Sequence, residues 1–312
     1  MRIEYHRTLL ADRVRNDALY AALKTLIRPG ETTVADIGAG TGFIGLLASQ
    51  LGAREIYLYE QAAVAGVAEA VLKRNNARNC RLIPFSSREV SDPPRVDLVV
   101  SETLGNYALE EDIISTLNDV RRRFLKPGGV VVPASLTQHM APVVDGRVQN
   151  ELTIWDEVGY GLDLAPAKAM SLNNAYVRTL APSELWQSGR SAIAWDRVDF
   201  TKENRTSRKG EGRWIAETAT AVYGFALWWT TELAPGVSLS TAPDAPRTHW
   251  EQIYLPLLEP LQMAPGEAVT ATVRSRSSPE TGTHLAWSAV AYDPASKPRK
   301  RQSLDLDKGY LP

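Results

Sequence analysis

The amino-acid sequence predicts an α/β protein in which a doubly wound sheet is followed by a mainly β domain. Over residues 1–133, strand patterns alternate with helix patterns, which is typical of a parallel sheet with helices on both faces. After Pro133 the strand-like runs follow one another, separated by clusters of Pro, Gly and Ser, as in sandwiches and barrels. We therefore expect a Rossmann-like domain over residues 1–133 and a β-barrel-like domain over residues 134–312.

The elements of the first half are predicted from the spacing of apolar residues. Short apolar runs rich in β-branched side chains predict strands at residues 33–37, 55–59, 81–85, 96–101 and 130–132. Helical periodicity predicts helices at residues 43–51, 63–75 and 111–125. The last helix should stop at residues 126–129, because the sequence KPGG places a proline and two glycines there.

The second half combines strand-like runs with one insertion. The runs lie at residues 136–141, 191–200, 214–230, 250–255, 268–275 and 285–291. Residues 161–189 interrupt them with a partly helical pattern, so we expect a helical arm inserted in the β domain.

The composition is that of an ordinary soluble globular protein and points away from several classes. The formal net charge is −1, so a nucleic-acid partner is not expected, and the basic runs at residues 121–123 and 297–301 should be solvated surface. Cys80 is the only cysteine, so no internal disulfide can form, and no Cys/His/acidic spacing suggests a metal site. No signal-peptide pattern is present, and no apolar run approaches the roughly 18 to 20 residues needed to span a bilayer. We therefore expect a cytoplasmic protein without a membrane partner.

A glycine-rich turn lies between the first predicted strand and the following helix. Residues 36–42 read DIGAGTG, and the glycines let the backbone turn tightly and approach a ligand. The dinucleotide fingerprint G-x-G-x-x-G fails, since its third glycine would fall at Phe43. Glu60 follows the next predicted strand, where a carboxylate can accept hydrogen bonds from ribose hydroxyls. The D-x-G-x-G-x-G spacing resembles the motif of class I methyltransferases and implies S-adenosyl-L-methionine; a dinucleotide dehydrogenase and a turn without a ligand are the alternatives.

Two acidic residues flank the loop after the fourth predicted strand. Glu102 lies beyond the carboxyl end of that strand, where doubly wound sheets bind ligands, and Glu111 begins the next predicted helix. A loop that folds back between them would aim both carboxylates into one pocket. Alternatively, Glu111 only complements the helix N-terminus and Glu102 is a surface acid.

Three segments resemble the protein arginine methyltransferase family, and the resemblance extends over nearly the whole chain. Residues 101–111 (SETLGNYALEE) resemble its double-glutamate loop, with the same separation of the two acids. Residues 240–250 (STAPDAPRTHW) resemble its Thr-His-Trp loop, and residues 9–15 (LLADRVR) resemble the helix before its first strand. The resemblance implies an enzyme that transfers a methyl group from S-adenosyl-L-methionine to a terminal guanidino nitrogen of arginine.

The resemblance also assigns cofactor-binding residues by position. Arg15 matches the arginine that binds the methionine carboxylate, a task for which a planar guanidinium is suited. Glu60 matches the ribose-binding acid, and Ser87 and Arg88 fall where the family contacts adenine, next to Glu89. The turn and the resemblance together give the expected cofactor-binding residues Arg15, Asp36, Gly38, Gly40, Gly42, Glu60, Ser87 and Arg88.

The candidate catalytic and substrate-binding residues come from the same comparison. Glu102 and Glu111 match the pair that grips the substrate guanidinium, and Asp12 and His249 match a pair that is hydrogen-bonded in the family. Two carboxylates can hold a guanidinium by charge-assisted hydrogen bonds and orient one terminal nitrogen toward the methyl group. After transfer a proton must leave, with Glu111 or the Asp12–His249 pair as candidate acceptors. Trp250 is expected either to wall the guanidinium by a cation–π contact or to pack between the domains.

The resemblance leaves the acceptor and the assembly open. The substrate is an arginine in a protein or peptide, or alternatively free arginine or another small guanidine, because the two carboxylates contact only the guanidinium. A catalytically silent binding homologue is a third interpretation. Residues 161–189 lie where the family carries its dimerisation arm, so we expect a homodimer. The sequence starts shortly before Leu9, which predicts a shortened lid and a more exposed cofactor, and Leu9 and Ile113 replace two methionines of the family, so the product type is open.

Overall fold

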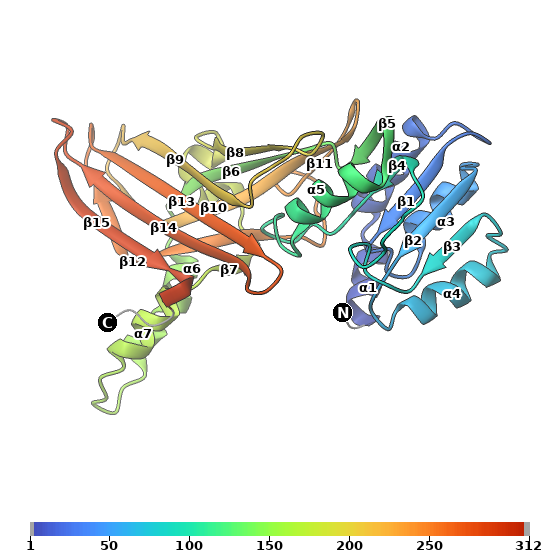
Figure 1. Ribbon diagram of the computed structural model, residues 1–312. Helices are drawn as coiled ribbons and strands as arrows, with labels where there is room; N and C mark the ends of the chain where they lie inside the picture. Colours follow the sequence, from blue (N-terminus) through green and yellow to red (C-terminus); the bar gives the residue numbers. More distant parts are fainter. Residues whose placement is uncertain (1–2, 309–312) are drawn as a thin grey trace.

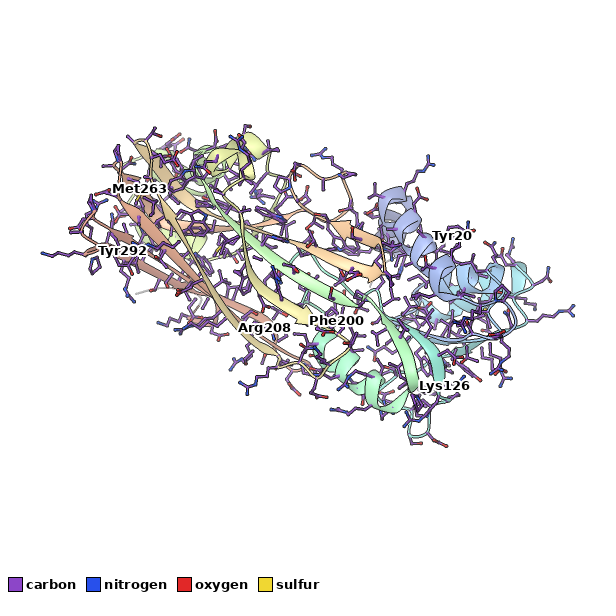
Figure 2. All side chains as sticks on the ribbon, turned by 90° about the horizontal axis from the view of Figure 1, so that it is seen from above. Tyr20, Lys126, Phe200, Arg208, Met263 and Tyr292 are labelled. Atoms are coloured by element: carbon purple, nitrogen blue, oxygen red, sulfur yellow. The ribbon has the colours of Figure 1, made fainter. Side chains whose placement is uncertain are left out.

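The structure of the chain is a computed structural model that describes residues 3–308. Figure 1 shows a parallel sheet with its helices at one end and long antiparallel strands at the other. Figure 2, seen from above, places Tyr20 in the first part and Met263 and Tyr292 at the far end of the second, so the two parts lie end to end. Among residues 3–308, no helix is long and apolar enough to cross a membrane.

The first part is a five-stranded parallel sheet with the strand order β3-β2-β1-β4-β5, as the alternating pattern predicts. The strands are β1 (Thr33–Ile37), β2 (Glu55–Tyr59), β3 (Cys80–Ile83), β4 (Val96–Val100) and β5 (Leu125–Val132). The helices are α1 (Ile3–Ala11), α2 (Arg13–Leu26), α3 (Phe43–Gln50), α4 (Ala65–Arg74) and α5 (Ile113–Arg123). The strand order reverses between β1 and β4, and the crevice at such a switch point is where doubly wound sheets bind ligands.

The central strands are buried on both faces, which explains their continuous apolar runs. All residues of β1 are buried, and β4 is buried except at Asp97. Residues 126–129 differ from the prediction, because α5 already ends at Arg123 and the KPGG segment belongs to β5. The pairing of β5 with β4 shifts register between Val96 and Leu98, and such a bulge tolerates glycines within a strand.

The second part consists of two antiparallel sheets. One has the order β7-β12-β10-β6-β8, with β11 paired to β10, and the other has the order β15-β14-β13-β9. The strands of the first sheet are β6 (Ser135–Val143), β7 (Tyr176–Arg178), β8 (Ile193–Asp199), β10 (Thr220–Ala234), β11 (Val237–Ser240) and β12 (Gln252–Met263). The strands of the second are β9 (Ser207–Ile215), β13 (Ala268–Ser278), β14 (Gly282–Tyr292) and β15 (Pro298–Asp305).

Two strands differ from the prediction. The run at residues 214–230 is two strands, because the chain leaves β9 after Ile215 and enters β10 at Thr220. The basic run at residues 297–301 is mostly exposed, as expected, but residues 298–301 also open β15, a strand that the sequence analysis does not predict. In β15 only Gln302 and Leu304 are buried, so the exposed charged residues mask the alternation that marks a strand.

The helical arm starts earlier than predicted. It comprises α6 (Arg147–Leu152), a 3-10 turn η1 (Ile154–Glu157) and α7 (Ala165–Leu172), and the loop before α7 projects away from the sheets in Figure 1. The later part of residues 161–189 returns to the sheet, where β7 pairs with β12. The arm is therefore a protrusion of the β domain that spans roughly α6 to α7.

Candidate active site

A cavity of about 680 Å³ lies beyond the carboxyl ends of the parallel strands. Its walls come from α1, α2, the turn after β1, the start of α3, the residues after β2, β3 and β4, the start of α5, and the β13–β14 hairpin of the second part. The lining includes most of the predicted site residues, namely Arg15, Gly38, Gly40, Glu60, Ser87, Arg88, Glu102 and Glu111. The fold thus brings together side chains that are separated by up to about a hundred positions in the sequence.

The glycine turn forms one wall of the cavity with its backbone. Gly38 and Gly40 have φ angles of +73° and +55°, which residues with a side chain rarely adopt. A Cβ at Gly38 would lie 2.9 Å from Thr103 Cγ2, and one at Gly40 would lie 3.0 Å from the His6 ring. Glycine is therefore required at both positions for conformation and for space.

Asp36 and Gly42 do not line the cavity, which corrects their assignment as cofactor-binding residues. Asp36 is buried beneath the turn, where its Oδ2 accepts a hydrogen bond from the Gly45 N–H of α3 at 3.1 Å. Burial raises the pKa of Asp36 to about 7. Gly42 precedes α3 in a left-handed conformation and packs toward Leu58. Both residues therefore support the turn from behind.

Glu60 is fixed at the mouth of the turn by backbone groups. Its Oε2 accepts from Gly40 N–H at 2.9 Å, and its Oε1 accepts from Ala62 N–H at 2.7 Å. Each carboxylate oxygen has a second lone pair, so both can still accept hydroxyl groups. This geometry suits the binding of a ribose diol.

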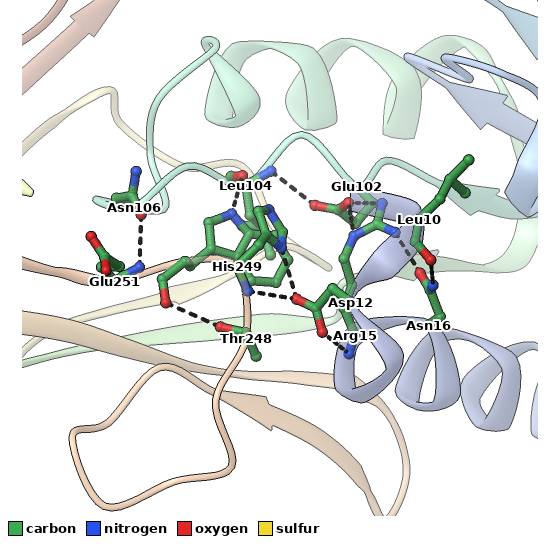
Figure 3. Close-up of polar contacts among 11 residues, drawn as sticks. Leu10, Asp12, Arg15, Asn16, Glu102, Leu104, Asn106, Thr248, His249 and Glu251 are labelled. Atoms are coloured by element: carbon green, nitrogen blue, oxygen red, sulfur yellow. Dashed lines mark hydrogen bonds and ion pairs between the residues drawn. The ribbon is translucent and has the colours of Figure 1, made fainter. Parts of the chain in front are cut away.

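Arg15 and Glu102 form a buried ion pair at the centre of the site, as Figure 3 shows. Arg15 Nε lies 2.6 Å from Glu102 Oε2, Nη2 also contacts this oxygen, and Nη1 donates to Asn16 Oδ1 at 2.8 Å. The two side chains are only 6% and 5% exposed. Burial raises the pKa of Glu102, and the positive charge of Arg15 opposes that rise.

Glu111 lines the same cavity without a partner. Among residues 3–308, no hydrogen bond or ion pair holds its carboxylate. Desolvation raises the pKa of Glu111, and the negative charges of Glu110 and Glu60 add to the rise. Glu111 and Asp112 both have left-handed backbones, with φ of +54° and +55°, and each such residue costs on the order of 1–3 kcal/mol.

Asp12 and His249 are hydrogen-bonded across the two parts of the molecule (Figure 3). Asp12 Oδ2 accepts from the His249 N–H at 2.8 Å and lies 2.8 Å from His249 Nδ1, while Oδ1 caps α2 by accepting from Arg15 N–H at 2.9 Å. Burial lowers the pKa of His249, although Asp12 opposes this. Burial alone would raise the pKa of Asp12, but the hydrogen bonds from Arg15 and His249 lower it.

Trp250 is not among the residues that line the cavity, and its contacts favour the second of its two expected roles, packing between the domains. Its Nε1–H donates to the Leu104 carbonyl at 2.9 Å, and its ring packs edge-on against Trp229 with centroids 5.0 Å apart. Trp229 in turn donates to the Gly105 carbonyl at 3.1 Å. Both indoles therefore tie the loop after β4, which carries Glu102, to the second part of the molecule.

His6 is a site residue that the sequence analysis does not identify. It lies in α1, is buried and lines the cavity beside Gly40. Its Nε2 has no hydrogen-bond partner among residues 3–308, and burial lowers its pKa. The i, i+3, i+4 spacing of His6, Leu9 and Leu10, which all line the cavity, is the signal that could have placed it. Helix α1 thus covers one side of the cavity.

The segment after β3 supplies the remaining predicted residues. Ser87 is buried in the cavity wall, and its carbonyl accepts from Arg123 Nη2 at 2.7 Å. Arg88 lines the cavity but directs its guanidinium to Asp112, with Nη2 and Oδ2 2.5 Å apart. Glu89 is exposed and does not line the cavity.

Comparison with known proteins places this site in a family. The family pattern described as the arginine methyltransferase oligomerization subdomain matches residues 134–293, just over half of the chain. Protein arginine N-methyltransferase 6 of Xenopus laevis is 30% identical over 297 residues, which cover 91% of this chain and 86% of that protein. The chain belongs to the protein arginine N-methyltransferase family.

Further matches agree with this membership. Residues 19–158 match the pattern for ribosomal protein L11 methyltransferase (PrmA). Protein arginine N-methyltransferase 1 of Dictyostelium discoideum is 26% identical and is covered over 80% of its length by 86% of this chain. In fold, this family member is similar to the Trypanosoma brucei PRMT1 enzyme-prozyme heterotetrameric complex with AdoHcy, with a TM-score of 0.86, 24% identity and coverage of 97% and 98%. Protein arginine methyltransferase 10 of Arabidopsis thaliana has a similar fold, with a TM-score of 0.81 and 23% identity over 98% of both chains.

Proposed function

We propose that the protein transfers a methyl group from S-adenosyl-L-methionine to a terminal guanidino nitrogen of an arginine in a protein or peptide. The observation that carries this proposal is the presence of Glu102 and Glu111 in the cavity that also holds the glycine turn and Glu60. A nucleoside site and a pair of carboxylates in one cavity suit a reaction between a nucleoside cofactor and a cationic acceptor.

The residues of the cavity fit the cofactor. Gly38 and Gly40 expose backbone where a Cβ would intrude, Glu60 has free lone pairs for a ribose, and Arg15 has a guanidinium for the methionine carboxylate. Ser87 adds a buried wall where the adenine is expected. When bound, the cofactor supplies an electrophilic methyl group on its sulfonium.

The two glutamates act on the acceptor, which is a poor nucleophile in its protonated form. A guanidinium has a pKa above about 12 and delocalised nitrogen lone pairs. Charge-assisted hydrogen bonds from Glu102 and Glu111 orient one terminal nitrogen and draw positive charge toward the others. Glu102 is already held by Arg15, so it keeps one direction, while the unpartnered Glu111 completes the grip from the opposite end of the loop.

We consider two groups as acceptors of the proton that the methylated guanidinium releases: Glu111, which lines the cavity, and His249, which like Asp12 lies outside its lining. The raised pKa of Glu111 makes it a better base than an ordinary carboxylate. His249 is neutral at physiological pH because burial lowers its pKa, and its Nδ1 faces Asp12. The neutral ring therefore donates from Nδ1 and leaves Nε2 as the acceptor.

The charges in the cavity favour a peptide over free arginine. An α-carboxylate needs a cation, and among residues 3–308 the cavity-lining arginines are Arg15 and Arg88. Arg15 is assigned to the methionine carboxylate of the cofactor, and Arg88 is paired with Asp112. No unpaired cation in the described part of the cavity is thus placed for a free amino acid.

The proposal is tested by mass spectrometry of products after incubation with the cofactor and three acceptors. The acceptors are free arginine, short arginine peptides and a glycine–arginine-rich protein. We expect methylated peptide and protein, with little product from free arginine. Methylation of free arginine alone would favour the small-guanidine alternative. Absence of every product, with cofactor binding seen by calorimetry, would favour a binding homologue.

We also propose that the protein forms a homodimer through the arm between α6 and α7. The arm exposes apolar side chains that a monomer would leave in water, including Tyr160 at 93% and Leu162 at 63% exposure. Sedimentation at micromolar concentration should show a dimer that the double variant Tyr160→Ser/Leu162→Ser converts to a monomer. Ile215→Ser, at an exposed apolar residue of β9, is the matched control and should remain dimeric. A monomeric wild type would refute this proposal.

A further inference from the structure

Arg88 reaches from the cofactor side of the cavity to the substrate side. Its Nη2 donates to Asp112 Oδ2 at 2.5 Å and to Thr116 Oγ1 at 3.1 Å, so one nitrogen bridges two residues at the start of α5. Arg88 follows β3, and these partners lie 24 and 28 positions later in the sequence. The side chains of Arg88 and Asp112 are 33% and 12% exposed, so the pair is partly shielded from water.

The segment that Arg88 holds is under backbone strain. Glu111 and Asp112 are consecutive non-glycine residues with left-handed backbones, and such conformations persist only where the surroundings fix them. The carboxylate of Asp112 is fixed on both sides, because Oδ1 accepts from Ser115 Oγ at 2.6 Å and Oδ2 accepts from Arg88. The Ser115 contact is local to α5 and Ile113 and Ile114 anchor the helix in the core, so Arg88 provides the polar link from the Asp112 side chain to the rest of the domain.

Glu111 depends on this link for its direction. Among the described residues its carboxylate has no partner of its own, so its position follows from the backbone that carries it. That backbone is anchored on one side by Glu110, whose carboxylate is held within the loop by Asn106 and Tyr107, and on the other side by Asp112. Loss of the Arg88 contact would free the second anchor.

We propose that Arg88 is a positioning residue that fixes Glu111 for the substrate guanidinium by clamping Asp112 and Thr116. This inference rests on the proposed function and deepens it. In this role Arg88 acts on the substrate side of the cavity, instead of making the adenine contact that the family resemblance implies. Since Arg88 also lines the cavity beside Ser87, it ties the cofactor-side segment to the substrate clamp.

The kinetic test compares Arg88→Ala and Arg88→Lys with the wild type on an arginine peptide. We expect Arg88→Ala to lower kcat about ten-fold while the calorimetric Kd for S-adenosyl-L-methionine stays within about two-fold, because the orientation of the clamp is lost and the cofactor site is kept. Arg88→Lys can still pair with Asp112, so it should lower kcat by no more than about three-fold. Arg81→Ala is the matched control, since it removes an exposed arginine paired with Glu55 on β2, outside the cavity.

A double-mutant comparison identifies the partner. The Arg88→Ala/Asp112→Asn variant should be no slower than the slower single variant, because both substitutions break one contact. A weaker cofactor Kd with unchanged kcat at saturating cofactor would overturn the inference in favour of an adenine contact. Additive losses in the double variant would also overturn it.

Amide hydrogen exchange separates this inference from the proposed function. The amides of residues 110–114 should exchange faster in Arg88→Ala than in the wild type and in Arg81→Ala. If the wild type methylates no arginine substrate but this exchange still rises, the proposed function fails and the positioning of the segment stands. Unchanged exchange at residues 110–114 would overturn the inference whatever the rates show.

Discussion

The guanidinium of Arg15 and the carboxylate of Glu102 share one buried ion pair, with Nε and Oε2 2.6 Å apart. Arg15 stands in the cofactor wall and Glu102 in the acceptor clamp, so one pair of charges serves both halves of the site. This contact therefore fixes the position of Glu102 in the clamp relative to the cofactor wall.

The substitution Glu102→Gln should abolish turnover and leave cofactor binding nearly intact. Glutamine keeps the volume of the side chain but removes the charge that grips a guanidinium, and we expect a loss of at least about a hundred-fold in kcat. Product formation on an arginine peptide and calorimetry with S-adenosyl-L-methionine measure the two effects. Glu211→Gln on the exposed face of β9 is the control. Turnover equal to the wild type would refute the assignment of Glu102.

Removal of Arg15 should destabilise the fold more than removal of both partners. Arg15→Met leaves the buried Glu102 carboxylate without its counter-charge, which typically costs about 3–5 kcal/mol. The double variant Arg15→Met/Glu102→Gln should regain a large part of this loss, because no uncompensated charge remains. Urea unfolding of the single variants and the double variant gives the free energies. Strictly additive losses would contradict a direct pair.

The pH dependence of the unfolding free energy should reflect the ionisation of Asp36. Its pKa is raised to about 7 by burial, so the folded state favours the protonated acid. The stability that the protonated form provides is complete below the ordinary pKa of 3.8 and is lost as the pH rises through about 7. Asp36→Asn keeps an acceptor for Gly45 and cannot ionise. The difference in unfolding free energy between Asp36→Asn and the wild type should therefore increase in favour of the variant between about pH 4 and 7, and stay constant above pH 7. If urea unfolding gives the same pH dependence of the unfolding free energy for both proteins, the raised pKa of Asp36 is disproved.

Trp229 and Trp250 form a seam between the loop after β4 and the second part of the molecule. The stability of this seam should depend on the hydrogen bonds of the indole N–H groups as well as on the volume of the rings. Trp250→Phe removes the hydrogen bond to the Leu104 carbonyl and leaves that acceptor buried, at a cost of about 1–3 kcal/mol. Trp195→Phe is a matched control, because its buried indole N–H has no hydrogen-bond partner within residues 3–308. We expect Trp250→Phe to lose more unfolding free energy than Trp195→Phe. An equal loss would show that the seam is held by packing alone.

The sequence predicted elements best where one local pattern decides them. The strands at residues 33–37 and 55–59 agree with β1 and β2 residue for residue, since each is a short, mostly apolar run. The strand β15 was missed because its outward side chains are charged and only Gln302 and Leu304 are buried. Boundaries also failed where glycines lie inside a strand, as in β5.

The site was predicted where the sequence carries a motif and missed where contacts are long-range. Glu60, Glu102 and Glu111 were found because each follows a strand or begins a helix at a recognisable spacing. The proximity of His6 to Gly40 joins α1 to the turn after β1, and the spacing of His6, Leu9 and Leu10 marks a common helix face without indicating what that face contacts. Likewise, the direction of the Arg88 side chain depends on Asp112, which is distant in sequence and becomes a neighbour only after folding.

The loop after β4 belongs to the first domain by its place in the chain and to the second by its contacts. The carbonyls of Leu104 and Gly105 are bound by Trp250 and Trp229, and the Asn106 side chain accepts from the Glu251 N–H at 2.8 Å. Neither domain can therefore be exchanged for that of a distant homologue without carrying this set of contacts along. In evolutionary terms, the two halves of the protein are constrained to change together. A substitution at Trp229 or Trp250 in the second half displaces the loop that carries Glu102, which holds the acceptor, in the first half.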